Sequence, residues 1–186
     1  MNGAIRMNRF AALTSAFLIL ACLALPGTAL ESKVLTVTEK TLSVGLGPSF
    51  EIINSKLNAS DKGMSSQDFV INDTASNGSA FLSVMSVYDE IIGKLSPHVL
   101  TELFLTGGLA GVEARGDRVV ENWTATSSLG DNVTVYVLST NDSRIASMGG
   151  KYDVAVWNLD HSNYVVMTSL LDKDNTTQII KKLAIK

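Results

Sequence analysis

The sequence is poor in the side chains that cross-link or catalyse. Of its 186 residues only one is cysteine, Cys22, and two are histidine, His98 and His161. Because Cys22 lies near the start, the chain beyond residue 29 has no disulfide, no thiol nucleophile and no cysteine zinc site. That part must be stabilised by burial of apolar surface alone.

Basic side chains are also scarce, and they are scattered. Beyond residue 29 the chain holds 13 Lys and Arg against 18 Asp and Glu, a net charge of −5. Phosphate contacts need clustered Lys and Arg, so this pattern argues against a nucleic-acid partner.

Only one long hydrophobic run is present, from Phe10 to Leu25. Arg6 and Arg9 precede it, and Pro26 with the small residues 27–29 follows it. This order predicts a signal peptide over residues 1–29, which leaves residues 30–186 as a single domain. Two alternatives stay open, an uncleaved membrane anchor and lipidation of Cys22, and either would be the domain's only contact with a membrane.

Seven Asn-x-Ser/Thr triplets (sequons) lie in the predicted domain, although it contains only 10 Asn residues. All lack Pro in the middle position and are formal acceptors of N-linked sugar. Five fall at predicted loops, whereas the placement of the first and the fourth stays open. The acceptors are Asn58, Asn72, Asn77, Asn122, Asn132, Asn141 and Asn175.

Local patterns predict an α+β fold. Strand-like segments at 33–44, 50–53, 69–71 and 80–88 occupy the first half, with a loop at 54–67. Ser96 as N-cap and Pro97 as first helical residue predict a central helix, preceded by a helical turn capped by Asp89 and ended by Gly107-Gly108.

Turn residues divide the second half into a predicted strand meander and a closing helix. Glycine, asparagine and aspartate separate the strand candidates, and residues 133–137 alternate cleanly between apolar and polar. We therefore expect a twisted antiparallel β-sheet packed against one central and one C-terminal helix. The strand candidates are 119–126, 133–139, 144–148, 152–159 and 164–170, and the helix is 174–184.

Few residues suggest chemistry, and each has a plain structural interpretation. His98 and His161, with nearby acids, could serve a hydrolase, and Trp123 or Trp157 could stack on a sugar. Arg115-Gly116-Asp117 matches an adhesion tripeptide but is also an ordinary turn, and residues 172–175 start like a calcium loop without its Gly and Glu. We predict no catalytic residue, cofactor or metal.

The order of elements resembles the PsbP-like α/β fold. Gly45 to Phe50, with Pro48 before an aromatic, is similar to an early turn of that family, and Ile179-Ile180 with Leu183 resembles its closing helix. The resemblance implies a non-catalytic accessory subunit or binding module. Separately, dense sequons without cysteine resemble archaeal cell-surface glycoproteins.

Together these patterns predict an exported cell-envelope glycoprotein domain that acts as an accessory or binding module. Its partner would be an envelope protein or a small ligand. The alternatives are an extracytoplasmic hydrolase and a small-ligand or sugar-binding protein. Fold resemblance alone does not carry function, so these alternatives depend on the site.

Overall fold

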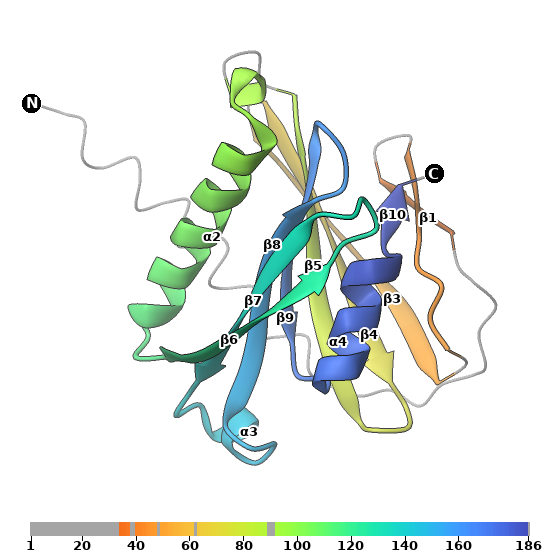
Figure 1. The fold of residues 1–186 in the computed structure, drawn as a ribbon. Helices are drawn as coiled ribbons and strands as arrows, with labels where there is room; N and C mark the ends of the chain where they lie inside the picture. Colours follow the sequence, from red (N-terminus) through yellow and green to blue (C-terminus); the bar gives the residue numbers. More distant parts are fainter. Residues whose placement is uncertain (1–33, 38–39, 48, 62, 89–91, 186) are drawn as a thin grey trace, which may run out of the picture.

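The computed structural model describes residues 34–37, 40–47, 49–61, 63–88 and 92–185 (Figure 1). The predicted signal peptide, Cys22 and the predicted cap Asp89 lie outside these residues. The described chain is an α+β fold built on a seven-stranded antiparallel sheet, which confirms the predicted fold class and sheet type.

The large sheet has the order β3-β4-β5-β9-β8-β7-β6, and a small sheet has the order β1-β2-β10. The bounds are β1 Val34–Val37, β2 Lys40–Ser43, β3 Phe50–Asp61, β4 Met64–Asp73, β5 Gly78–Val87, η1 Ile92–Lys94, α2 Pro97–Glu113, β6 Arg118–Thr126, β7 Asn132–Ser139, α3 Ser143–Ala146, β8 Lys151–Asn158, β9 Asn163–Ser169, α4 Lys173–Lys182 and β10 Ala184–Ile185. Consecutive strands β6 to β9 pair as a meander, and β5 beside β9 joins it to the first three strands.

Helix α2 begins where the sequence predicts. Ser96 is its N-cap, and the Ser96 Oγ accepts a hydrogen bond from the Val99 amide at 3.3 Å. The predicted end at Gly107-Gly108 is wrong, because the helix continues to Glu113. Beyond the glycines, Leu109 and Val112 pack on the sheet, and this burial outweighs the cost of about 1 kcal/mol for each helical glycine.

Three other segments differ from their predictions. The segment 33–44, predicted as one strand, contains two strands, β1 and β2, which pair antiparallel. Residues 54–67 are not a loop but most of the hairpin β3–β4, where Asp61 pairs with Met64 across a turn that uses Gly63 at φ 83°. Polar residues can form such a strand pair because backbone amide and carbonyl groups make the hydrogen bonds between strands. Residues 144–148 are not a strand, since Asp142 caps the short helix α3 there.

The main hydrophobic cluster contains residues of the large sheet and of α4. Ile179 and Ile180 of α4 are buried there against strand residues such as Leu82, Val165 and Met167. Two smaller clusters contain residues of α2, one with Leu100 and Tyr164 and the other with Val112 and Tyr152. Figure 1 shows α2 and α4 on opposite sides of the sheet.

Candidate functional site

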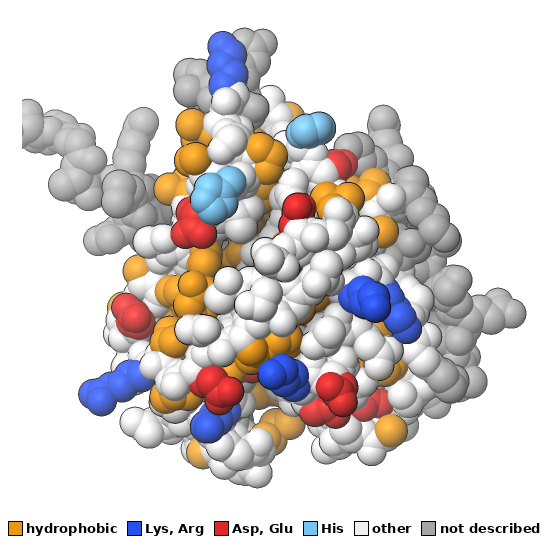
Figure 2. All heavy atoms as spheres, viewed as in Figure 1, with side chains coloured by type: hydrophobic (Ala, Val, Ile, Leu, Met, Phe, Trp, Pro, Cys, Tyr) orange, Lys and Arg blue, Asp and Glu red, His pale blue; other side chains and the backbone are white. Residues whose placement is uncertain are grey.

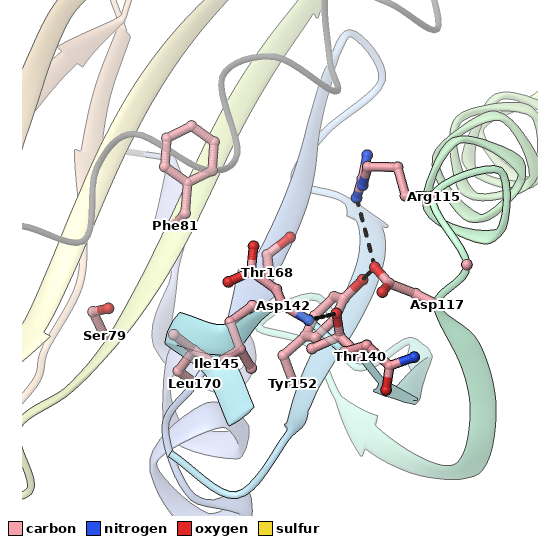
Figure 3. Close-up of a pocket in the computed structure, with 12 residues that line it drawn as sticks. Ser79, Phe81, Arg115, Asp117, Thr140, Asp142, Ile145, Tyr152, Thr168 and Leu170 are labelled. Atoms are coloured by element: carbon pink, nitrogen blue, oxygen red, sulfur yellow. Dashed lines mark hydrogen bonds and ion pairs between the residues drawn. The ribbon is translucent and has the colours of Figure 1, made fainter. Parts of the chain in front are cut away.

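A cleft of about 400 Å³ opens beside the C-terminal end of α2 (Figure 3). Its volume lies within the range typical of small-molecule sites. The lining comes from β5, β8, β9, the turn that leaves α2, and the β7–α3 loop. The lining residues are Ser79, Phe81, Arg115, Gly116, Asp117, Thr140, Asn141, Asp142, Ile145, Tyr152, Thr168 and Leu170.

The turn that leaves α2 builds the polar wall of the cleft. Gly116 adopts φ 94°, a left-handed conformation that glycine accepts without strain. The Gly116 amide donates to the Glu113 carbonyl at 2.9 Å, and the Asp117 amide donates to the Val112 carbonyl at 3.3 Å. These bonds fix the direction in which the Asp117 side chain enters the site.

Asp117 is the central polar group of the cleft. It is only 8% exposed, and its Oδ2 accepts a hydrogen bond from the Tyr152 hydroxyl at 2.7 Å. The Arg115 guanidinium lies 4.0 Å from the same oxygen. Burial, together with the neighbouring Asp117 carboxylate, raises the pKa of Tyr152, so the phenol stays protonated and remains a donor.

Replacing Tyr152 with phenylalanine is expected to lower the free energy of unfolding by about 1–2 kcal/mol, because the buried Asp117 carboxylate loses its hydrogen bond. Urea unfolding followed by circular dichroism measures this loss. Tyr136→Phe is the matched control, since the Tyr136 ring is only partly buried in the same cluster. Equal losses in the two variants would contradict the role of the Tyr152 hydroxyl.

The opposite rim of the cleft is formed by the β7–α3 loop. The Asp142 amide donates to Thr140 Oγ1 at 3.1 Å, and Asp142 Oδ1 accepts from the Arg144 amide at 2.9 Å. The hydrogen bonds from the Arg144 guanidinium hold the pKa of Asp142 at about 2. Asp142 is therefore ionised and bonded to Arg144, whereas Asp117 is bonded to Tyr152.

The floor of the cleft is apolar. Phe81 of β5, Ile145 of α3 and Leu170 after β9 contribute carbon surface, and Thr168 adds a hydroxyl among them. Figure 3 shows Thr168 and Tyr152 between the Phe81 side and the Arg115–Asp117 side. An apolar floor with a few convergent polar groups fits reversible binding of a small amphiphilic molecule.

The two histidines do not belong to this cleft. His98 lies in the first turn of α2 and His161 in the β8–β9 turn, and neither lines the cavity. Among the described residues, no group of three His, Cys, Asp or Glu could hold a metal ion. In the segment that starts like a calcium loop, Asp172 caps α4, and its Oδ1 accepts from the Asn175 amide at 2.8 Å.

Neither tryptophan lines the cleft. Trp157 is 3% exposed and packs in the main core, so its ring is not available for stacking on a sugar. Trp123 is partly buried, and the Lys173 Nζ lies 5.1 Å from its ring centroid. The sugar-stacking alternative is therefore ruled out for Trp157 only, and for the partly buried Trp123 it stays a prediction.

The acceptor asparagines are spread over the surface. Asn77, Asn122, Asn132 and Asn141 are exposed, and Asn77 sits in the β4–β5 turn at φ 57°. Asn72 and Asn175 are partly buried, and the Asn175 Nδ2 donates to Asp172 at 3.2 Å and to Asp73 at 3.4 Å. Asn58 lies on β3, and its side chain is outside the description.

Sequence reasoning treated Arg115-Gly116-Asp117 as an ordinary turn or an adhesion tripeptide. The structure places it in the wall of the cleft, where burial of Asp117 prevents its use as an adhesive loop. The remaining lining residues come from segments far apart in the chain, and no spacing in the sequence links them.

The described residues contain no helix with the length and apolar character needed to cross a membrane. Comparison of the chain with known families finds no matching family model, and no curated protein or solved structure matches it. The resemblance to the PsbP-like fold therefore stays a prediction.

Proposed function

We propose that this chain is an exported, non-catalytic glycoprotein domain that serves as a binding or accessory module of the cell envelope. The observation that carries the proposal is the position of the acceptor asparagines. Four of them are exposed: two lie between secondary-structure elements, one lies at the start of β7 and one lies within β6. A sugar must point to solvent, and these sites allow it.

One long stretch of the chain carries no acceptor. Between Asn77 and Asn122 the chain has no sequon, and this stretch includes α2. Val99 is 46% and Leu103 is 59% exposed on that helix, which contains no Lys or Arg. Figure 2 shows apolar side chains exposed along the side of the molecule where α2 lies. An uncoated apolar surface of this kind supports contact with a partner.

The same proposal includes the finer architecture, in which the sheet is packed between the central helix α2 and the C-terminal helix α4. The buried Leu100 on one face and the buried Ile180 on the other support it. This arrangement keeps the turns that bear acceptors at the rim of the sheet.

Glycopeptide mapping of the protein from its native source tests the proposal. We expect export, processing near Ala29, and sugar at the four exposed acceptors. Occupancy should be lower at Asn175, because its amide already donates to Asp172 and Asp73. An unprocessed chain without carbohydrate would refute the proposal.

Binding of a small ligand is the second candidate function, and the cleft with its buried Asp117 favours it. The ligand would offer a hydroxyl or N–H donor to the Asp117 carboxylate and an apolar part to Phe81. Native mass spectrometry of the same preparation reports any bound species. A hydrolase based on His98 and His161 has less support, because neither residue lines the cleft.

A further inference from the structure

The large sheet does not close on itself. Strands β3 and β6 form its two edges, and no further strand of the described chain pairs with their outer sides (Figure 1). An edge strand presents unpaired amide and carbonyl groups, which form a template for strand addition by another chain. A domain that must stay soluble outside the cell needs protection at both edges.

Each of these edge strands carries a sequon within its length. Asn58 of β3 pairs with Gln67, and Asn122 of β6 pairs with Tyr136. The other acceptors within strands lie at strand ends, since Asn72 is the next-to-last residue of β4 and Asn132 is the first of β7. In the described chain, an acceptor well inside a strand therefore occurs only at the edges of the large sheet.

Both edge acceptors follow an irregularity in strand pairing. The register of β3 shifts between Asn54 and Asn58, and the register of β6 shifts between Val119 and Glu121. Such irregularities disrupt the edge over the residues that they occupy. Regular strand pairing resumes at Asn58 in β3 and at Glu121 in β6. Each acceptor therefore lies in the regular part of its edge strand, where another strand could pair.

The sequence of β6 contains few features, apart from the irregularity at 119–121, that oppose association at this edge. Val119 is 37% and Val120 is 51% exposed, and Arg118 and Glu121 cancel in charge. The strand has no Lys or Pro, the residues that proteins commonly place on edges to prevent association. High β-propensity with low net charge favours intermolecular pairing.

We propose that sugars on Asn58 and Asn122 guard the two edges of the sheet against strand addition by a second copy of this chain. An added strand must approach to about 4.8 Å from the edge. The Asn122 side chain is exposed and projects from the face of the sheet opposite to that of its neighbour Trp123. A branched sugar attached to this side chain would obstruct the path of a strand that approaches the β6 edge. This inference rests on the proposed function, because it requires that the chain is glycosylated.

The substitutions Ser60→Ala and Thr124→Ala test the inference, because they destroy the sequons of Asn58 and Asn122 and leave both asparagines in place. The double variant, produced in the glycosylating native host, should form β-rich oligomers about tenfold faster than the native protein. Light scattering and thioflavin T fluorescence measure this rate. Enzymatic removal of sugar from the folded native protein should have the same effect and avoids any folding defect of the variant.

Two controls isolate the position of the sugar. Ser143→Ala removes the sequon of Asn141, which lies in a loop, and Thr124→Ser keeps the sequon of β6, so both variants should form oligomers no faster than the native protein. A double variant and a deglycosylated protein that form oligomers no faster than the native protein would overturn the inference. Sugar at the loop acceptors but not at Asn58 and Asn122 would also overturn it while leaving the proposed function intact, whereas a chain without any sugar would end both.

Discussion

Replacing Ile179 with alanine is expected to lower the free energy of unfolding by about 3–4 kcal/mol. Ile179 is fully buried on α4, where it packs in the main core with strand residues such as Val165 and Met167. Truncation removes apolar contact and leaves a cavity, because the sheet below is too rigid to close it. The midpoint of urea unfolding measures the loss.

Lys181→Ala on the same helix is the matched control. Lys181 is exposed, and we expect its replacement to change the free energy of unfolding by less than about 0.5 kcal/mol. A similarly small effect for Ile179→Ala would mean that α4 does not pack on the core, and it would contradict the proposed packing of the sheet between α2 and α4.

Local signals predicted the elements that depend on local chemistry. Ser96 and Pro97 determine the start of α2, because the serine side chain caps the helix and proline is favoured at its first position. The alternation in residues 133–137 is also informative, since Val133 and Val135 are buried while Thr134 is exposed. In these places the local preference and the tertiary structure agree.

The failures occurred where tertiary contacts outweigh local preference. Gly107-Gly108 looks like a helix end, yet burial of Val112 holds the helix together beyond it. Residues 54–67 look like a loop because they are polar, yet backbone pairing with β4 needs no apolar side chains. Residues 144–148 look like a strand, yet the cap at Asp142 starts a helical turn.

The cleft could not be predicted from local patterns. Asp117 and Tyr152 are 35 residues apart, and their hydrogen bond depends on how the exit of α2 meets β8. The histidines and tryptophans were more conspicuous in the sequence because these residue types often act in sites. Their rarity in the chain carried no information about where a cavity would form.

Replacing Asp153 with asparagine is expected to stabilise the protein at pH 7 and to leave its stability unchanged near pH 4. Asp153 is buried on β8, and burial raises its pKa to about 6, although a hydrogen bond with the Thr176 side chain opposes the shift. The nearby Glu121 raises the pKa further, and Lys173 lowers it. A carboxyl group in this position is more easily accommodated when it is neutral.

The direction of this pH dependence follows from the difference in the pKa of Asp153 between the folded and unfolded states. Because the pKa of Asp153 is higher in the folded protein than its ordinary value of 3.8, its stabilising contribution is complete below pH 4 and is lost as the pH rises through 6. The shift corresponds to about 2–3 kcal/mol at pH 7. An asparagine side chain cannot titrate, so the difference in unfolding free energy between Asp153→Asn and the native protein should grow from pH 4 to pH 7.

Urea unfolding at fixed ionic strength between pH 4 and pH 7 measures this difference, and Asp142→Asn is the control. The pKa of Asp142 is lowered to about 2 by its bonds to Arg144, so its stabilising contribution is present above its ordinary pKa and is lost only as the pH falls. The Asp142 variant should therefore be destabilised by a constant amount from pH 5 to pH 7. Parallel stability curves for Asp153→Asn and the native protein would show that the pKa of Asp153 is the same in the folded and unfolded states, with Lys173 and Thr176 offsetting the cost of burial.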